Sequence, residues 1–563
     1  MSSVFPDVLS SRVRSLLILF LTASLTSLAF ASGPYVIGSS NTVTADPTIP
    51  RPKTTPCIVQ LLSNAEFDNF NPVPFPFAPP ANCPGPWAKV VFTADINVTA
   101  GVQFDRTANF WLGPTNIYFG TTAEPGATLA PSWHVESDLT DYSPIFMTSQ
   151  QGTADIGNLV NGTYTGIIYA SSTLEFYPLA PGQTAPLTAN QVYALSAGPT
   201  GGTVTLNDTT STLAGTFTLP TNIENAYLDV YAQSQSGDEF WYTCVPNDVS
   251  GELFSCGNTG FRETEITIDG TPAGVAPVYP WIFTGGIDPF LWFPLPGVQT
   301  LNFQPYRVDL TPFASSLSNG QQHTVSLSVF NANSYFSVTA SLLLYLDTGS
   351  TSVTGALTRN TLTAAPNPVI TENLNVGNTI TGTVKVASQR NFTISGYVNT
   401  SKGKVTTTVT QAVNFVNNQK FDITSTLFVQ DIKLTSSVNS KTVTAAAGQP
   451  TIVNRRSLEF PLSMDISQVT QSNGDINQTT KSWQNFGVQT TIDQGDHIYA
   501  DLLNNSVIAQ DTLEFDSGFN ILGNINQSSS QLYSNFDTHG VSQVCILTAA
   551  KNALTSFTHT CSQ

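Results

Sequence analysis

Two acidic side chains in distant parts of the chain could share acid–base chemistry. Asp105 stands beside Arg106 in QFDRTANFWLG, at the end of a strand-like run, and Glu239 stands in GDEFWYTC beside three aromatic residues. An adjacent guanidinium favours the charged form of a carboxylate, whereas an aromatic environment can raise the pKa of a carboxyl group. The sequence therefore predicts an ionised Asp105 and a more readily protonated Glu239. An Asp next to an Arg is, by itself, more often a surface ion pair.

The rest of the chain indicates an all-β protein that must bring these acids together. At 563 residues it is too long for one core, and about three domains are expected. Short runs of alternating apolar and polar residues, separated by Gly, Asn and Pro, are typical of β-sandwiches and jelly rolls. We predict a first jelly roll at 50–178, a Pro/Gly/Thr-rich connection at 179–218, a second jelly roll at 219–347 and a third all-β domain at 348–563.

Two further local patterns carry expectations. In the second domain, HTVSLSVFNANSYFSVTASLLLYLD predicts a hairpin with one buried face. The stretch 348–358 is expected to be a Gly/Ser/Thr-rich linker. For the third domain, the composition favours structural packing over a glycan-binding role.

The N-terminus has the pattern of an export signal. Two arginines precede the apolar run LLILFLTA, and Ala29 and Ala31 supply small residues for cleavage. We therefore expect residues 1–31 to be a signal peptide, 32–49 a linker, and the mature protein to act in a secreted or periplasmic location. No later run approaches the roughly 20 apolar residues that span a bilayer.

Charge limits the classes of binding partner, and the cysteine content indicates disulfides. Only 10% of residues are charged and the net charge is -18, so nucleic acid and anionic membranes are poor partners, and a monomer is expected. Six cysteines in an exported chain suggest disulfides, and the guess from nearest neighbours is Cys57–Cys83, Cys244–Cys256 and Cys545–Cys561. No spacing of His and Cys suits a metal, and we expect neither metal nor cofactor.

Several strings of residues, in order, resemble a known family. GVQFDR, FWLG, TAEP, GNLVNGTYTGIIY, GDEFWY, FRETEITIDGTPAG, TGGIDPFLW and LTPF are similar to the peptide:N-glycosidase A family of plants, fungi and acid-living bacteria. The likeness spans about 50–347. The first two domains also resemble the paired jelly rolls of the bacterial F-type enzymes, in which an Asp-Arg pair faces a Glu across a cleft.

The resemblance implies an amidase that acts on N-linked glycans of peptides or glycoproteins. It would split the amide between Asn and the first N-acetylglucosamine, so that Asn becomes Asp and the glycan leaves as a 1-amino sugar. By position, Asp105 would activate the attacking water, Glu239 would hold that water or the leaving nitrogen, and Arg106 would steady the developing oxyanion.

The same resemblance implies a set of substrate-binding residues. Arg262 would help fix the carboxylates, and the two tryptophans would contact sugar; the full set is Glu124, Asn158, Asp238, Trp241, Arg262 and Trp292. Asn158 is also a departure, because it stands where the F-type enzymes carry a third acidic residue.

Two other functions stay open at this point. An endo-glycosidase also uses paired carboxylates, but it cuts between sugars and leaves one sugar on an unchanged Asn. A secreted glycan-binding or adhesive β-protein would have no activity at all, and its function would survive Asp105→Asn.

Overall fold

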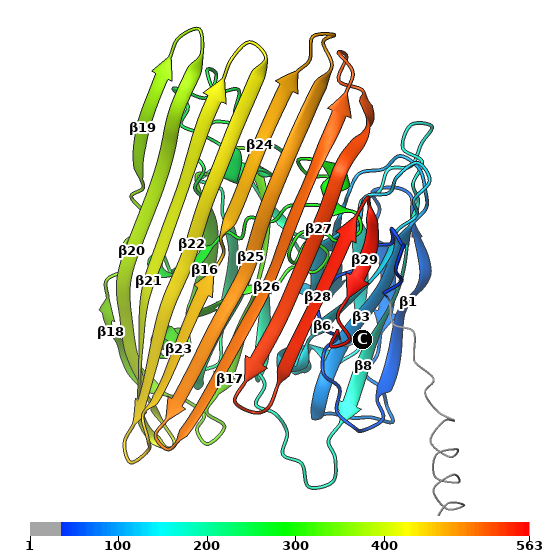
Figure 1. Cartoon of the computed structure of the whole chain (residues 1–563). Coiled ribbons are helices and arrows are strands. Elements are labelled where there is room, and N and C mark those ends of the chain that lie inside the picture. Colours follow the sequence, from blue (N-terminus) through cyan, green and yellow to red (C-terminus); the bar gives the residue numbers. More distant parts are fainter. Residues whose placement is uncertain (1–34, 562–563) are drawn as a thin grey trace, which may run out of the picture.

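The computed structural model describes residues 35–561, which form two sandwiches of antiparallel strands and one large antiparallel sheet (Figure 1). The predicted all-β class is confirmed. The expected signal peptide lies outside the described residues. No helix within 35–561 has the length and apolar character needed to cross a membrane.

The first domain is an eight-stranded jelly roll. One sheet has the order β1-β8-β3-β6 and the facing sheet the order β2-β7-β4-β5. Alternate residues point into the space between the sheets, where Phe92 packs on Phe110 and on Tyr118 at ring distances of 5.1 and 5.6 Å. The strands are β1 (Cys57–Phe67), β2 (Val73–Phe77), β3 (Trp87–Val98), β4 (Thr107–Leu112), β5 (Thr115–Thr121), β6 (Ser132–Asp138), β7 (Gln150–Ile156) and β8 (Ile168–Pro178).

The second domain repeats this topology. Its sheets have the orders β10-β17-β12-β15 and β11-β16-β13-β14, and β9 adds to β17. The strands are β9 (Gln191–Leu195), β10 (Val204–Leu206), β11 (Leu213–Thr218), β12 (Ile223–Gln235), β13 (Glu263–Ile268), β14 (Thr271–Pro277), β15 (Tyr306–Asp309), β16 (Gln322–Phe330) and β17 (Tyr335–Leu346). The segment 179–218, expected to be a connection, therefore supplies three strands of this domain.

The predicted hairpin of the second domain is wrong. Strand β16 pairs with β11 and β13, whereas β17 pairs with β12, β10 and β9. The connection between them crosses from one sheet to the other, as jelly-roll topology requires. Short helical turns lie in the loops: η1 (Thr140–Phe146), η2 (Ser236–Asp238), η3 (Trp241–Thr243), η4 (Pro289–Trp292), η5 (Thr311–Phe313) and α2 (Ala314–Leu317).

The third domain is one 12-stranded antiparallel sheet, whose strands lie side by side across the front of the molecule in Figure 1. One face packs on the second domain, for example where Phe415 meets Phe261 at a ring distance of 4.8 Å. The strands are β18 (Thr354–Asn360), β19 (Val369–Val376), β20 (Ile380–Thr400), β21 (Gly403–Ile423), β22 (Leu427–Ala446), β23 (Ile452–Glu459), β24 (Leu462–Thr470), β25 (Ile476–Gln494), β26 (His497–Phe515), β27 (Ile521–Asp537), β28 (Ser542–Ala550) and β29 (Ala553–Phe557). Strand β18 takes up the end of the expected linker at 348–358.

Two of the three expected disulfides form. Cys244 is bonded to Cys256 and Cys545 to Cys561. Cys57 and Cys83 are neighbours but remain thiols, so their predicted disulfide is wrong. Burial, with a hydrogen bond to Cys57, raises the pKa of the Cys83 thiol to about 11, which keeps it protonated.

The segment expected to be an N-terminal linker is held against the large sheet where the structure describes it. Val43 donates its backbone N–H to the Pro294 carbonyl over 3.0 Å, and Ala45 donates to Gln531 Oε1 over 2.7 Å. Tyr35, Val43 and Ala45 are buried in a small apolar cluster with residues of β27, β28 and β29. This part of the chain therefore belongs to the folded body.

Candidate active site

The two jelly rolls meet along the edge of β5. Thr121 donates its backbone N–H to the Thr300 carbonyl over 3.0 Å, and Phe303 donates to the Phe119 carbonyl over 2.9 Å. These strand-like bonds align loops of the first domain with the 284–288 loop of the second. The acids of the candidate site lie on both sides of this contact.

Asp105 lies just before β4, where its carboxylate reaches the second domain. Gly285 donates its backbone N–H to Asp105 Oδ2 over 2.8 Å. A Cβ at Gly285 would lie 2.1 Å from Glu124 Oε2 and 3.4 Å from Asp105 Oδ2. Only glycine therefore lets the backbone approach both carboxyl groups without a shift.

Glu124 comes from the loop after β5 and lies beside Asp105. Its Oε2 accepts the backbone N–H of Asp105 at 3.3 Å, and its own backbone N–H bonds Thr284 Oγ1 at 2.9 Å. The Thr284 hydroxyl in turn donates to the Thr122 carbonyl over 3.1 Å. Glu124 was expected to bind substrate, and its place makes it a third acidic group of the site.

Glu239 follows β12 and is positioned by a buried ion pair at the preceding residue. Arg262 donates from Nε and Nη2 to Asp238 Oδ1 over 3.0 and 2.8 Å. The other Asp238 oxygen accepts the backbone N–H groups of Asn333 and Ser334 at 2.8 and 2.7 Å. Asp238 and Arg262 thus bond each other inside the protein, and their expected contact with substrate stays a prediction.

Hydrogen bonds join β4, which follows Asp105, to β12, which precedes Glu239. Thr107, two residues after Asp105, donates its hydroxyl to Gln233 Oε1 over 3.2 Å. Gln235 Nε2 donates to the same Thr107 oxygen over 3.0 Å, and Gln235 precedes Glu239 by four residues. Phe240, which follows Glu239, would lie 3.1 Å from a Cβ on Gly286, and Gly286 follows the Gly285 that bonds Asp105, so the segments that carry the two acids are neighbours.

Burial and mutual repulsion shift the three carboxyl groups towards the neutral form. Burial, with the charge of Asp105, raises the pKa of Glu124 to about 8 and that of Glu239 to about 7. Burial also raises the pKa of Asp105, although the Gly285 N–H and Arg106 oppose the rise. Such displaced carboxyl groups at one interface are typical of a functional site.

Arg106 does not form the expected ion pair with Asp105. Its Nη2 donates to Gln103 Oε1 over 2.5 Å, and its guanidinium carbon lies 5.5 Å from the Phe104 ring centre. Its Nε is buried with no hydrogen-bond partner in the protein. Arg106 lowers the pKa of Asp105, as expected, but burial has the larger effect and raises it.

Three expected sugar-binding residues are buried. Trp241 is 0% exposed and packs on Phe415 of the large sheet, and Trp292 is 2% exposed with its Nε1 donating to the Gly286 carbonyl over 3.0 Å. Asn158 is also buried, and its Nδ2 donates to the Phe67 and Gly166 carbonyls. All three side chains are covered in this structure, and their expected contact with sugar stays a prediction.

The sequence did not predict the role of the Gly285 N–H or the hydrogen bonds of Gln233 and Gln235 to Thr107. Gly285 was visible only within TGGIDPFLW, where a pair of glycines before a helical turn can signal a close backbone approach. Gln233 and Gln235 stand two apart before GDEF, which places them on one face of a strand. Their partner Thr107 carries no signal of its own.

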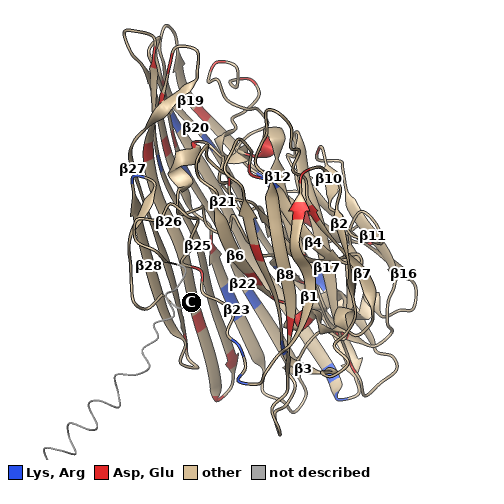
Figure 2. Cartoon of the chain, turned by 90° about the vertical axis from the view of Figure 1, so that its right-hand side faces the viewer, with Lys and Arg blue, Asp and Glu red and all other residues tan. Residues whose placement is uncertain are grey.

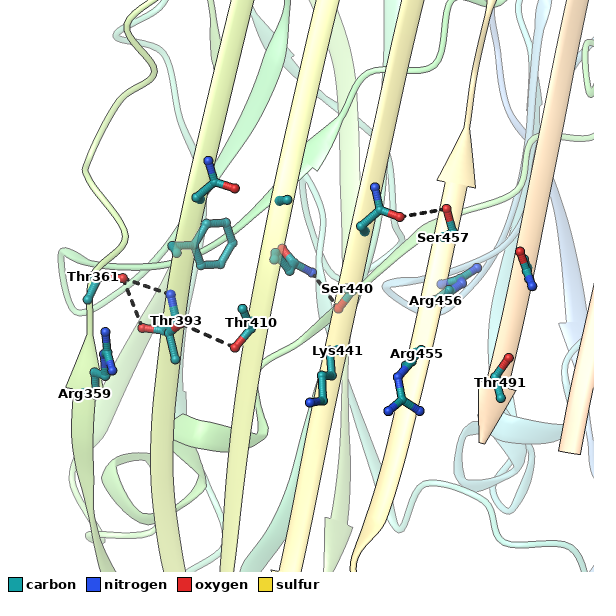
Figure 3. Close-up of a pocket in the computed structure, with 16 residues that line it drawn as sticks. Arg359, Thr361, Thr393, Thr410, Ser440, Lys441, Arg455, Arg456, Ser457 and Thr491 are labelled. Carbon is teal, nitrogen blue, oxygen red and sulfur yellow. Dashed lines mark hydrogen bonds between the residues drawn. The ribbon is translucent and has the colours of Figure 1, made fainter. Parts of the chain in front are cut away.

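Charged side chains outside the candidate site are few, and several of them line a groove on the large sheet. Figure 2 shows that Lys, Arg, Asp and Glu are sparse and scattered over the chain. A groove of about 590 Å³ crosses the large sheet and contains Arg359, Lys441 and Arg455 among hydroxyl side chains (Figure 3). It includes none of the three site acids. Within 35–561 no set of three or more His, Cys, Asp or Glu side chains is arranged to hold a metal ion.

Comparison with known proteins gives consistent matches. Residues 47–363 match the family model described as peptide N-acetyl-beta-D-glucosaminyl asparaginase amidase A. The chain is 29% identical over 389 residues to peptide-N4-(N-acetyl-beta-glucosaminyl)asparagine amidase A of Prunus dulcis, covering 65% of this chain and 67% of that protein.

Solved structures are more distantly similar. One is PNGF-II, with 14% identity and a TM-score of 0.37 over 52% of this chain and 66% of that one. Another is PNGase F, a glycosylasparaginase from Flavobacterium meningosepticum, with 13% identity and a TM-score of 0.35 over 52% of this chain and 97% of that one.

Proposed function

The chain belongs to the peptide N-acetyl-beta-D-glucosaminyl asparaginase amidase A family, and we propose that Asp105, Glu124 and Glu239 form its reaction centre. The chain is an amidase that acts on N-linked glycans of peptides or glycoproteins. It hydrolyses the amide between the Asn side chain and the first N-acetylglucosamine. The water oxygen joins the amide carbon, the C–N bond breaks, and the glycan leaves as a 1-amino sugar.

The observation that carries this assignment is the meeting of three carboxyl groups at the contact of the two jelly rolls. Asp105 and Glu124 come from the first domain, and Gly285 of the second domain bonds Asp105 through its backbone N–H and lies against Glu124. Glu239 comes from the second domain and feels the charge of Asp105. A substrate amide placed between the domains would be within reach of acids from both sides.

Asp105 is the candidate general base. Its charged form alone among the three is supported by both a second-domain N–H group and a nearby guanidinium. It would take a proton from the water that attacks the amide carbonyl. The 2.8 Å bond from Gly285 holds the carboxylate so that its other oxygen can face that water.

Glu239 is the candidate acid. With a pKa near 7 it carries a proton under mildly acidic conditions, and it can give that proton to the departing nitrogen. The amide nitrogen is a poor leaving group without a proton, so this transfer and the attack by water complement each other. The buried Asp238–Arg262 pair fixes the turn from which Glu239 projects.

Glu124 and Arg106 complete the centre. Glu124, with a pKa of about 8, stays neutral beside Asp105 and can act as a hydrogen-bond donor rather than a second negative charge. Arg106, whose positive charge acts on both Asp105 and Glu124, would stabilise the negative charge that develops on the carbonyl oxygen.

Hydrolysis of an N-glycopeptide in ¹⁸O-labelled water tests the proposal. We expect the peptide product to carry Asp in place of Asn, with the label in the new carboxyl group. Asp105→Asn should retain the fold but lose turnover by about 10³-fold, within the range for a general base. The matched control is Asp138→Asn, a partly exposed acid of the same domain that pairs with Lys89.

Other product patterns would overturn the assignment. A peptide that keeps one sugar on an unchanged Asn would identify an endo-glycosidase. Full activity of Asp105→Asn would remove Asp105 from the reaction. Binding of glycopeptide with no product under any condition would identify a glycan-binding protein.

We also infer that the protein acts outside the cytoplasm. The export pattern at 1–31 and the disulfides Cys244–Cys256 and Cys545–Cys561 support this location. A protein purified from the culture medium that begins near Ser32 would agree with it. Retention of the intact N-terminus in the cytoplasm would contradict it.

A further inference from the structure

A second groove, of about 540 Å³, lies between the second jelly roll and the ends of the large sheet. One wall is formed by the second domain, through Phe240, Phe254 and Ile287. The other is formed by the turn between β21 and β22 and by Phe519 in the turn before β27. All of the residues that line this groove are uncharged.

The groove starts where the carboxyl cluster ends. Phe240 directly follows Glu239 in the chain, and its Cε1 would lie 3.1 Å from a Cβ placed on Gly286. Gly286 directly follows Gly285, which bonds Asp105. The ring of Phe240 and this pair of glycines therefore separate the site from the groove by a single layer of residues.

The large sheet also supports this region with hydrogen bonds. Gln478 Nε2 donates to the Ile287 carbonyl over 3.1 Å, and Gln430 Nε2 donates to the Thr243 carbonyl over 2.9 Å. Both glutamines line the groove themselves. The third domain thus holds the loops of the site and builds the opposite wall of the groove.

Three apolar residues of the groove have an unfavourable backbone conformation, and two of them are exposed. Phe254 is 75% exposed and Phe519 is 69% exposed. Phe254, Ile287 and Phe519 have φ values of 51°, 67° and 63°. Among the 13 described non-glycine residues with positive φ, these three are the ones with large apolar side chains. Bulky residues rarely adopt this conformation, and such strain clusters at binding sites.

The lining identifies the chemistry of the ligand. Exposed aromatic faces pack on the apolar faces of sugar rings, and side-chain hydroxyl and amide groups bond sugar hydroxyls. The groove offers both, with Thr424, Ser425, Thr426, Gln468 and Thr470 beside the phenylalanines. It offers no countercharge for an acidic or basic ligand.

We propose that this groove binds uncharged outer sugars of the N-glycan whose first sugar lies at the carboxyl cluster. The inference rests on the proposed function, because that function places the first sugar at the carboxyl cluster, one layer of residues away from the groove. The third domain then serves substrate selection, since it lets the enzyme distinguish long neutral glycans from short ones.

Direct binding and kinetics test the groove separately from the chemistry. The probe is a free, uncharged, mannose-rich oligosaccharide titrated into the full-length protein by calorimetry. The double variant Phe254→Ala/Phe519→Ala should bind it about tenfold more weakly than the wild type. For hydrolysis, the double variant should raise KM about tenfold for a glycopeptide with that glycan and leave KM unchanged for the same peptide with one N-acetylglucosamine.

Two controls exclude a general effect on folding. Phe536→Ala removes a 41% exposed phenylalanine at the opposite end of β27 and should change neither binding nor KM. Phe519→Asn places a residue that tolerates positive φ at the strained position. It should keep or raise Tm while it weakens oligosaccharide binding, which a purely structural role of Phe519 would not produce.

Three outcomes overturn the proposal. They are the absence of oligosaccharide binding by the wild type, equal binding by the double variant, and an equal rise of KM for long and short glycans. A KM that depends on peptide length and not on glycan length would assign the groove to the peptide. Failure of the proposed function is distinguishable, because the wild type would then hydrolyse neither glycopeptide even if it binds the oligosaccharide.

Discussion

Gly285 of the second jelly roll donates its backbone N–H to the carboxylate of Asp105 in the first, over 2.8 Å. This bond ties the candidate base to the neighbouring domain, so its geometry depends on how the two jelly rolls are joined. It also requires a residue without Cβ, since that atom would lie 2.1 Å from Glu124 Oε2.

Gly285→Ala should therefore damage catalysis more than folding. The new methyl group must displace the flexible carboxyl end of Glu124, which also disturbs Asp105. We expect kcat to fall by about 10²-fold, as for the misplacement of a catalytic group by about 1 Å. Kinetics and thermal melting measure the two effects.

The matched control for this substitution is Gly251→Ala. No atom lies within 4 Å of a Cβ at Gly251, and its φ is not in the left-handed region. This variant should keep wild-type kcat. If Gly285→Ala is equally active, the Gly285 bond does not orient Asp105 for the reaction.

The raised pKa of Glu239 predicts that activity falls on the alkaline side of the pH–rate profile. Burial and the charge of Asp105 raise its pKa to about 7, and the proposed donor must be protonated. kcat/KM for an N-glycopeptide should therefore fall as pH rises through about 7. Glu239→Gln should lose most of the activity, and the remainder should not show this alkaline fall. A profile that instead rises through pH 7 to a plateau would mean that the reaction needs ionised Glu239.

The sequence could provide the class of fold and the two principal acids because both depend on local patterns. Alternation of apolar residues determines that a segment becomes a strand, and Asp105 and Glu239 each stand within a distinctive string. The same alternation does not determine which strand becomes the partner. A hairpin and a crossover between sheets look alike along β16 and β17, which explains the wrong pairing.

Side-chain direction is what the sequence could not predict at several candidate site residues. Asp238 and Glu239 are adjacent acids, yet Asp238 turns inward to Arg262, whereas Glu239 forms no ion pair in the described structure. Trp241 is covered by Phe415, which lies more than 170 residues later in the chain. Such burial by a distant domain leaves no trace in the local sequence around the tryptophan.

Glu124 predicts how the stability of the protein depends on pH. Burial and the Asp105 charge raise its pKa from 4.5 to about 8, so the folded state holds this proton more tightly than the unfolded state. This contribution to stability is fully present below about pH 4.5 and is lost as pH rises to about 8.

Glu124→Gln isolates that contribution because it keeps the shape without the proton. At pH 5 the variant and the wild type should melt at similar temperatures. At pH 8 the variant should be more stable by on the order of 2 kcal/mol, since the wild type must ionise a buried group or retain its proton at a cost. Melting curves at both values measure the difference. A wild type that gains stability relative to the variant between pH 5 and pH 8 would contradict the raised pKa.

The buried Asp238–Arg262 pair predicts a large effect on stability. Both side chains are fully buried, and Arg262 also donates from Nη1 to the carbonyls of Asn258, Thr259 and Phe261. Arg262→Met removes these donors and leaves the Asp238 charge without its counterion. We expect a loss of about 3–5 kcal/mol in unfolding free energy, as for other broken buried pairs.

The double variant Arg262→Met/Asp238→Asn separates the charge from the packing. Removal of the Asp238 charge should restore part of the stability, because the buried carboxylate no longer lacks a counterion, although three carbonyl oxygens still lack the guanidinium. Thermal melting compares both variants with Arg359→Met, a more exposed arginine of the large sheet that forms no ion pair in the described structure and should cost little. If Arg262→Met and Arg359→Met had the same melting temperature, the Asp238–Arg262 pair would not stabilise the turn that carries Glu239. The position of Glu239 would then depend on the hydrogen bonds of Gln235.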